Sequence, residues 1–439
     1  MIGDFASNRF ITLLWPVGTS ALTWYVRPTG DDNNDGTTAL TAFATLARAL
    51  REVPLYGANQ PTVIDITGMT ISAAELLQLG GGALGGTENT YQTPVVPNLP
   101  NRRQVQLRAD LTTVQALTVT SQVADPVTNL TTVTVSQAIT PGALDDCILV
   151  DEDGGLGPIV KNGYTSGAGP NTIYVASATT FAANTTAYTP GATLTFGDPA
   201  QGLDGAIHLA ALAAWSFHGL TLASTAGSKT AALTLWAHQP VDIYACVTDG
   251  LHLAGGAGQV LVYGSIIRDA SLVIEGGANL LAQKSTGRDL SILTAHGRAT
   301  LSETVFDTCS PFGGGSSSSQ FSGAITQTEV RNGSDAGVQC QFGTWALSNL
   351  RCTNNLGAGV YVTGAFEVAM TRVVGTGNDV GLQCPRNASV SANSSTNVTG
   401  GSGDVALGSV GVVAWTDFPP NFPITDTEQL VRVFRQGGI

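Results

Sequence analysis

The fold is decided by three short segments that repeat at a constant step of 22 residues: Gly337–Cys340 (GVQC), Gly359–Val362 (GVYV) and Gly381–Cys384 (GLQC). Gly403 continues the glycine column, and a second column with this step contains Ala346, Val368, Val390 and Val412. Each repeat predicts a glycine turn, a short strand with alternate residues inward, another turn and a second short strand. This pattern is typical of one rung of a parallel β-helix, with Cys340, Val362 and Cys384 pointing inward. Leucine-rich repeats are excluded because their leucine and asparagine ladder is missing.

Looser repeats upstream extend this solenoid, which we place at residues 203–415. The predicted first strands of successive rungs are Leu233–Leu235, Leu251–Leu253 and Leu272–Ile274. A glycine- and serine-rich stretch, 313–319, predicts a loop that leaves the coil. Because both ends of a solenoid expose apolar surface and unpaired backbone, we expect a cap at each end.

The caps are predicted at residues 23–100 and 416–439, with residues 1–22 as an N-terminal attachment segment. One helical face in the first cap would contain Phe43, Leu46, Ala47 and Leu50, and Ser72–Glu75 forms a capping box for a second helix. Thr425–Glu428 is another capping box, and it precedes a short amphipathic helix with Leu430, Val431, Val433 and Phe434.

Residues 101–200 interrupt the rung pattern and predict an inserted small β domain. Its expected antiparallel strands are Val133–Val135, Cys147–Val150, Thr172–Val175 and Thr193–Phe196. The predicted fold class is therefore all-β, a parallel β-helix solenoid with short N-terminal capping helices and this insertion.

The composition excludes several classes of protein. Only 12% of the 439 residues are charged, about half the usual share of roughly 25%, so coiled coils and charged helical bundles are excluded. The net charge of −13 argues against nucleic acid as a partner. No stretch reaches 18 apolar residues, so we predict no membrane insertion. The N-terminus lacks the features of a signal peptide, which predicts synthesis in the cytoplasm, and the six cysteines, without a CxxC pair, should be free thiols.

A resemblance to a known family lies near the N-terminus, in the segments Trp24–Gly36 and Thr41–Leu50. The matching residues are Tyr25, Val26, Gly30, Asp35, Gly36, Phe43, Thr45, Ala49 and Leu50. These segments resemble the opening motif of right-handed parallel β-helix proteins of the pectate-lyase-like superfold, which include many phage tailspikes. The resemblance implies right-handed winding, and the inserted domain is similar to small barrels of phage tail proteins. The Asn-Thr-Asp and Asp-Asp pairs of polygalacturonase-type enzymes, and the calcium-binding acid cluster of pectate lyases, are missing from residues 203–415.

Four aspartates are spaced by 20, 20 and 18 residues, which is close to the length of one rung: Asp249, Asp269, Asp289 and Asp307. Carboxylates on neighbouring rungs would lie about 5–10 Å apart, the separation used by glycosidases, and their mutual repulsion would raise their pKa values. Asp269 and Asp289 are therefore the candidate catalytic residues. The alternative is that these aspartates form turns through hydrogen bonds to their own backbone.

Two further sets of residues are candidate binding sites. Asp31, Asn33 and Asp35 match the first half of a calcium loop, although Ala42 replaces the final glutamate and such residues also form ordinary turns. The aromatic residues Trp215, Trp236, Tyr263 and Trp345 would stack on sugars if they face outward, and would belong to the core if they face inward. The histidines, with no partner motif, are interpreted as solvent-facing strand residues.

These patterns favour a virion structural and host-attachment protein: a tail fibre, tailspike or head spike of a phage or phage-like particle. It would recognise host surface polysaccharide as a homotrimer, with no resident cofactor; the alternative is calcium in the loop at 31–35. Other virion proteins would bind its N-terminal segment or its C-terminal helix. The alternative is a capsule-degrading depolymerase, a lyase or glycoside hydrolase, on the same fold. A secreted bacterial pectinase is opposed by the missing signal peptide.

Overall fold

The computed structural model describes residues 22–52, 62–72, 75, 105–164, 171–196, 215–224, 233–235, 241–249, 252–255, 259–268, 271–274, 279–288, 291–294, 298–308, 310–313, 322–365, 367–386, 388–392, 396–407, 411–415 and 434–435. Strands predominate in them, and most pair in parallel with strands one rung away. The chain divides into unit 1, Met1–Thr112 with Pro190–Leu261, and unit 2, Thr113–Thr189 with Val262–Ile439. The predicted solenoid is confirmed, while its right-handed winding stays a prediction. No described helix is long and apolar enough to cross a membrane.

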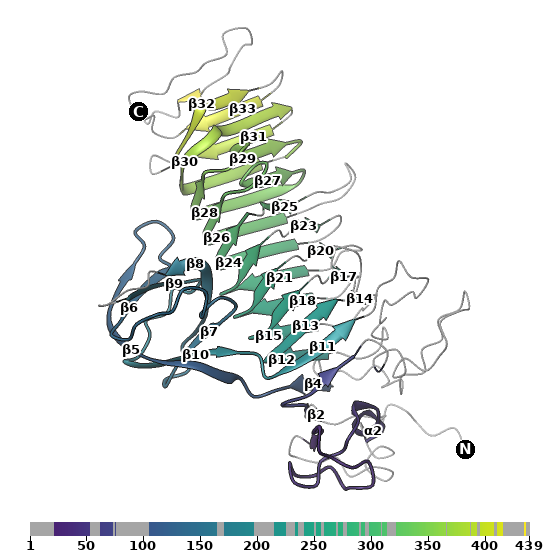
Figure 1. The fold of residues 1–439 in the computed structure, drawn as a ribbon. Coiled ribbons are helices and arrows are strands. Elements are labelled where there is room, and N and C mark those ends of the chain that lie inside the picture. The colour runs from purple at the N-terminus through teal and green to yellow at the C-terminus, as the bar shows by residue number, and fades with distance from the viewer. Residues whose placement is uncertain are drawn as a thin grey trace, which may run out of the picture. The chain divides into compact units, whose positions relative to one another are not determined.

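Unit 1 is a stack of parallel strands (Figure 1). One column contains β1 (Thr23–Tyr25), β2 (Thr62–Asp65), β4 (Val105–Arg108), β12 (Trp215–His218) and β15 (Val241–Tyr244). A second contains β3 (Thr70–Ile71), β11 (Ala192–Phe196), β13 (Leu220–Ser224) and β16 (Val247–Asp249), and a third pairs β14 (Leu233–Leu235) with β17 (His252–Gly255). The first column buries Ile64, Leu107, Phe217 and Ile243 in register, so its alternate residues face outward.

The first rung is closed by the helix α2 (Leu46–Arg51), which Thr45 caps by accepting a hydrogen bond from the Arg48 backbone N–H. Its buried residues are Leu46 and Ala49. The predicted face with Ala47 and Leu50 is wrong, because the helix begins three residues after Phe43, which instead pairs with Val26 in an isolated β-bridge. Phe43 is fully buried beside Gly36, where an added Cβ would lie 2.2 Å from the ring.

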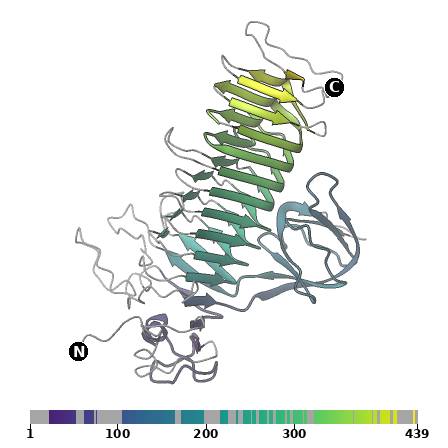
Figure 2. The same ribbon diagram turned by 180° about the vertical axis from the view of Figure 1, so that it is seen from behind.

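Unit 2 contains a coil of stacked strands and a barrel (Figures 1 and 2). The strands of the coil are β19 (Ile266–Arg268), β20 (Ser271–Ile274), β21 (Asn279–Gln283), β22 (Thr286–Arg288), β23 (Ser291–Thr294), β24 (Arg298–Asp307), β25 (Ser310–Gly313), β26 (Ser322–Arg331), β27 (Val338–Gln341), β28 (Thr344–Thr353), β29 (Ala358–Thr363), β30 (Glu367–Arg386), β31 (Ala388–Ala392), β32 (Asn397–Leu407), β33 (Gly411–Trp415) and β34 (Phe434–Arg435). Strand β18 (Gln259–Tyr263) runs across the boundary between the units. Phe434 lies in β34, so the predicted helix does not include it, and the rest of that helix lies outside the described residues.

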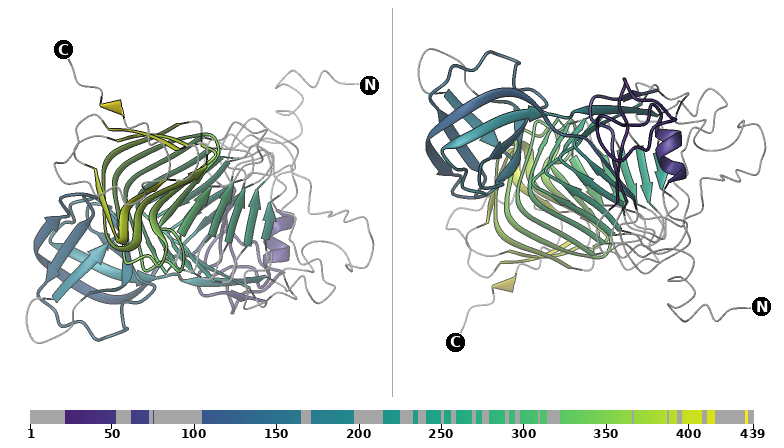
Figure 3. Two further views of the ribbon diagram at one scale, coloured as in Figure 1. Left: turned by 90° about the horizontal axis from the view of Figure 1, so that it is seen from above. Right: turned by 90° about the horizontal axis from the view of Figure 1, so that it is seen from below.

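The long strands β24, β26, β28 and β30 each bend at one non-glycine residue with positive φ: Glu303 (51°), Gln327 (47°), Asn349 (49°) and Arg372 (53°); β30 has a further positive φ at Gly377 (71°). Each bend separates parts of its strand that belong to different faces of the coil. Figure 3, which views the coil from above and from below, shows that the rungs are bent. The interior behind the bends contains a short hydroxyl ladder, in which Thr304 and Thr328 are fully buried with their Oγ1 atoms 3.0 Å apart. A second buried ladder joins Asn355 to Asn378, whose Oδ1 accepts the Asn355 side-chain amide at 2.8 Å.

The register confirms one predicted column and corrects the others. Cys340, Val362 and Cys384 are fully buried, and Val338, Val360 and Leu382 are in register. However, Gly403 pairs with Val380, a step of 23 residues, so it leaves the glycine column. The second column contains Trp345, Val368, Val390 and Val413 instead of Ala346 and Val412, because some rungs have one residue more than others.

The barrel of unit 2 is closed by six strands in the order β10, β5, β6, β9, β8 and β7. Their bounds are β5 (Thr112–Ala124), β6 (Thr131–Val135), β7 (Ile148–Asp151), β8 (Leu156–Tyr164), β9 (Asn171–Val175) and β10 (Asn184–Thr189). Its core is apolar and includes Val133, Leu149, Ile173 and Val175. The predicted fourth strand of the insertion is wrong: Thr193–Phe196 belongs to β11, which pairs in parallel with β13 of unit 1.

Candidate functional site

Of the four aspartates predicted to form a carboxylate ladder, the structure describes Asp249 and Asp307, and Asp307 does not continue the predicted column. Arg268, Arg288 and Asp307 occupy the same register position on successive rungs, so Asp307 is aligned with an arginine. Its carboxylate accepts hydrogen bonds from Arg331 Nη2 at 3.0 Å and Asn332 Nδ2 at 2.9 Å. Asp249 lies at the end of β16, while Asp269 and Asp289 lie outside the described residues.

The predicted calcium loop is held by hydrogen bonds within itself. Asp31 Oδ1 accepts the Asn33 backbone N–H at 2.9 Å, and Asp35 Oδ1 accepts the Thr41 hydroxyl at 2.6 Å and the Thr37 N–H at 3.0 Å. The hydrogen bond from Thr41, and to a smaller extent that from Thr37, lowers the pKa of Asp35. Among the described residues, no group of three or more histidine, cysteine, aspartate or glutamate side chains is arranged to hold a metal. Calcium at Asp31, Asn33 and Asp35 stays an untested alternative.

The aromatic candidates occupy different environments. Trp345 is 4% exposed, and its Nε1 donates to the Phe342 carbonyl at 2.9 Å, so it is a core residue and cannot stack on a sugar. Tyr263 is half-buried with the Lys284 ammonium 5.9 Å from its ring centroid. The backbone of Trp215 lies in β12, while its side chain and all of Trp236 lie outside the described residues.

The first halves of β24, β26, β28 and β30 form an outer face that we call the hydroxyl face. It is defined by two rows in register: Thr300, Ala324, Ala346 and Ala369 in one, and Ser302, Thr326, Ser348 and Thr371 in the other. The residues that alternate with these rows along each strand are buried in the coil, among them Leu301, Ile325 and Leu347. All of these outward side chains are at least partly exposed to solvent, and those of Ala346, Ala369 and Thr371 are the most exposed.

The hydroxyl face is uncharged and built from small side chains. Neighbouring rungs repeat at about 4.8 Å, so hydroxyl groups recur at a constant spacing along the row. Ser348 Oγ donates to Thr326 Oγ1 at 2.9 Å, which orients two members of the row and leaves further donor and acceptor capacity. Such a face offers many weak, regularly spaced hydrogen bonds to a ligand, and its two defining rows contain no acid; the exposed Glu367 lies at the start of β30, beside them.

The second halves of the same strands are covered by the barrel. In this outward row Val305, Glu329 and Arg351 are in register, and Val305 packs in an apolar cluster with the barrel residues Leu130, Val160 and Ala176. We call this contact the barrel seam, and both of its sides belong to unit 2. The barrel therefore has a fixed attachment on the coil.

Charged groups are paired across the barrel seam. Arg351 binds Asp125 through two atoms, Nη1 to Oδ2 at 2.7 Å and Nη2 to Oδ1 at 3.0 Å. Burial alone would raise the pKa of Asp125, but hydrogen bonds from the Thr128 and Val127 backbone and the Arg351 charge outweigh it, so the pKa is lowered. This bidentate geometry makes the pair directional as well as attractive.

A tyrosine and a glutamate complete the seam. The Tyr174 hydroxyl donates to Glu329 Oε2 at 2.7 Å, and Glu329 is only 6% exposed. Burial first, and then the Glu329 charge, raise the pKa of Tyr174 well above its usual range, so the phenol keeps its proton and remains a donor. At the bend, Glu303 Oε2 accepts the Ala178 backbone N–H at 2.7 Å. Glu303 and Glu329 thus both bind the barrel to the coil, and no pattern in the sequence predicted this role for either residue.

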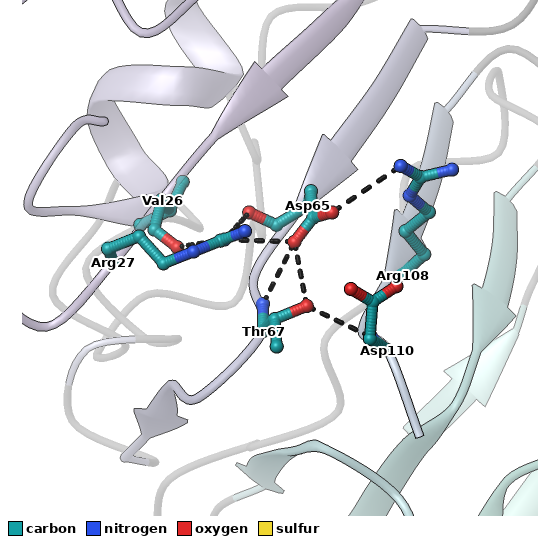
Figure 4. A network of polar contacts seen from close by, with 6 residues as sticks. All are labelled: Val26, Arg27, Asp65, Thr67, Arg108 and Asp110. Atoms are coloured by element: carbon teal, nitrogen blue, oxygen red, sulfur yellow. Dashed lines mark hydrogen bonds and ion pairs between the residues drawn. The ribbon is translucent and has the colours of Figure 1, made fainter. Parts of the chain in front are cut away.

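Another polar network lies at the first rungs of unit 1 (Figure 4). Asp65 Oδ1 receives Arg27 Nη1 at 2.9 Å and the Thr67 hydroxyl at 2.8 Å, while Arg108 Nη2 lies 3.4 Å from Oδ2. Burial raises the pKa of Asp65, but the Thr67 hydrogen bonds and the Arg27 charge outweigh this and lower it overall. The carboxylate stays ionised and joins β2 to β4 and to Arg27, which follows β1, so its role is structural.

Comparison with known proteins gives no family assignment. No protein-family model matches the chain, and no curated protein matches it. Among solved structures, the chain is similar to one described as "The complex structure of XylC with xylose". The TM-score is 0.30 and the sequence identity is 9%, and the match covers 90% of this chain and 68% of the other. It is also similar to a "Glycoside hydrolase", with a TM-score of 0.28 and 10% identity over 90% and 96% of the two chains. At these TM-scores the matches carry no argument about function.

Proposed function

We propose that this protein binds polysaccharide across the hydroxyl face and serves as a host-attachment protein of a phage or phage-like particle. The observation that carries the binding role is the hydroxyl face itself, with two uncharged rows in register on four consecutive rungs. A polysaccharide is a repeating ligand, and a repeating surface binds it through many weak contacts that act together. The assignment to a virion, as a tail fibre, tailspike or head spike, and assembly as a homotrimer rest on the sequence resemblance alone.

The face should be tested by adding charge and bulk to it. Ala346→Glu places a carboxylate in the middle of the exposed row, where it would displace the ligand from the flat surface. Thr376→Glu is the matched control, because Thr376 is equally exposed on β30 but lies beyond the Arg372 bend. In co-sedimentation with host cells and their purified polysaccharide, we expect Ala346→Glu to weaken binding by about tenfold, a loss of about 1.4 kcal/mol, and Thr376→Glu to bind like the wild type.

The same material distinguishes binding from cleavage of the glycan backbone. The proposal expects intact polysaccharide after long incubation, with no new reducing ends and no ultraviolet signal of unsaturated products. Equal binding by Ala346→Glu and the wild type would overturn the assignment of the face. Release of short oligosaccharides would favour the depolymerase, and loss of that release in Asp269→Asn or Asp289→Asn would identify the acid.

A further inference from the structure

A serine and a histidine on β12 of unit 1 are joined by a short hydrogen bond. Ser216 Oγ lies 2.6 Å from His218 Nε2, and the residue between them, Phe217, is buried in the coil at 2% exposure. Because side chains alternate along a strand, Ser216 and His218 share the opposite, outer face of the sheet. A hydroxyl within hydrogen-bond reach of an imidazole is the arrangement that activates a serine nucleophile.

The neighbouring rungs surround this pair with polar groups of unit 1. Ser216 is in register with Gln106 on one side and Asp242 on the other, while His218 is in register with Arg108 and Tyr244. The Tyr244 ring stacks on the imidazole, with centroids 4.8 Å apart and planes 25° apart, and so fixes the ring's orientation. Ser216 and Asp242 are 2% and 5% exposed, whereas His218 and Gln106 are half-buried.

Arg108 adds positive charge at the same place. One of its Nη atoms lies 3.4 Å from Asp65 (Figure 4), and its Nε atom is buried without a hydrogen-bond partner among the described residues. A guanidinium and a side-chain amide one rung away are suitable groups to stabilise negative charge that develops on an acyl oxygen. The cluster therefore holds a nucleophile, a base and two candidate oxyanion donors.

We propose that Ser216 and His218 form an acyl-transfer site that hydrolyses short acyl esters. With the imidazole proton on Nδ1, Nε2 accepts the Ser216 proton as Oγ attacks the ester carbonyl, and the carbon–oxygen bond to the alcohol then breaks. His218 returns the proton to the departing alcohol oxygen. Water next attacks the acyl-serine and gives a proton to Nε2; the bond between the acyl carbon and Oγ then breaks, the acid is released, and His218 returns the proton to Ser216 Oγ. The near-complete burial of Ser216 restricts the acyl group to a short one such as acetyl; that the alcohol is a sugar rests on the proposed function.

The first test is covalent. A fluorophosphonate probe should label the full-length protein at Ser216, detected by peptide mass spectrometry, and an excess of acetyl ester should slow the labelling. The second test is the rate of p-nitrophenyl acetate hydrolysis against the octanoate. We expect the acetate to be preferred, Ser216→Ala to abolish the reaction, His218→Gln to slow it by about 100-fold, and the wild-type rate to fall at acid pH, where a protonated imidazole accepts no proton.

Thr221→Ala is the matched control, since it removes another hydroxyl from the neighbouring strand β13 and should leave the rate unchanged. Absence of labelling at Ser216, or hydrolysis that survives Ser216→Ala, would overturn the proposal. Circular dichroism shows whether each variant is folded, and His218→Gln keeps a readout if Ser216→Ala is not. Acetate release from O-acetylated polysaccharide tests the sugar as the alcohol. Co-sedimentation by Ser216→Ala reports binding at the hydroxyl face separately, so failure of the esterase and failure of glycan binding are distinguishable.

Discussion

Replacing Tyr174 by Phe should loosen the barrel seam without disturbing the barrel. The substitution removes only the hydroxyl that donates to Glu329 Oε2 at 2.7 Å, and it leaves a carboxylate that is 6% exposed with one donor fewer. A hydrogen bond to a charged group contributes about 1.5–3 kcal/mol, so we take about 2 kcal/mol for this one. At 1.4 kcal/mol for each factor of ten, the seam should open about 30-fold more often.

Hydrogen exchange reports this opening directly. The backbone N–H of Ala178 crosses the seam to Glu303 Oε2, whereas the N–H of Thr131 bonds to Ser177 inside the barrel. In Tyr174→Phe, the peptide containing Ala178 should exchange faster by about that factor, while the Thr131 peptide should keep its protection. Glu329→Gln in the same background should cost less than it does alone, because the two changes remove one interaction.

The matched control is Tyr188→Phe, on β10 of the same barrel, whose hydroxyl makes no hydrogen bond with any described residue. It should leave exchange at Ala178 unchanged. The reasoning is refuted if Tyr174→Phe and Tyr188→Phe have the same effect, or if Ala178 and Thr131 accelerate together, since the second result would mean that the barrel unfolds as a whole.

Three further predictions follow from charge and burial. The pKa of Asp125 is lowered in the folded protein, so the stability that Asp125 gives the seam is present above the unfolded pKa near 3.9 and is lost as the pH falls through the folded pKa. Hydrogen exchange at Ala178, corrected for intrinsic rates, should therefore accelerate below about pH 4. In Asp125→Asn this pH dependence should be absent. Burial raises the pKa values of Cys147, Cys246 and Cys384 to about 12, so these thiols should react slowly with a disulfide reagent at pH 8 in the folded protein. After unfolding without a reductant, all six cysteines should titrate as free thiols, and a count below six would reveal a disulfide. Because Asp31 and Asp35 already accept hydrogen bonds from their own loop, millimolar calcium should leave the melting temperature unchanged, and a rise that Asp35→Asn abolishes would establish the site.

The sequence predicted the stack because its signal is local and periodic. Alternation within Val338–Cys340, and its recurrence at the next rungs, requires only that each strand bury the same side of its backbone. The register was less predictable, since a rung can take an extra residue between Trp345 and Val368 without a mark in the sequence. A constant step of 22 residues therefore put Ala346 in a buried column, although it is exposed.

The seam had no sequence signal at all. Asp125 and Arg351 are 226 residues apart, and each belongs to a segment that looks complete by itself, a turn in one case and a strand in the other. The Ser216 and His218 pair lies within three residues and is visible in retrospect, but strand alternation alone does not show that Oγ and Nε2 are 2.6 Å apart. Pairings of this kind depend on side-chain geometry, which periodicity does not specify.

The bends in β24, β26 and β28 divide each strand into two outer surfaces of different chemistry. Before Glu303, Gln327 and Asn349 the outward residues are alanine, serine and threonine apart from Arg298 at the start of β24; after them they include Val305, Glu329 and Arg351. The second set is apolar or charged and would be costly to leave unmatched, and the barrel covers it with an apolar cluster, a tyrosine and an aspartate. The first set has no such need, because small hydroxyl side chains are well solvated by water. This division supports the proposal that the barrel is attached to the coil as a fixed module while the hydroxyl face is kept for an exchangeable, uncharged and repeating ligand.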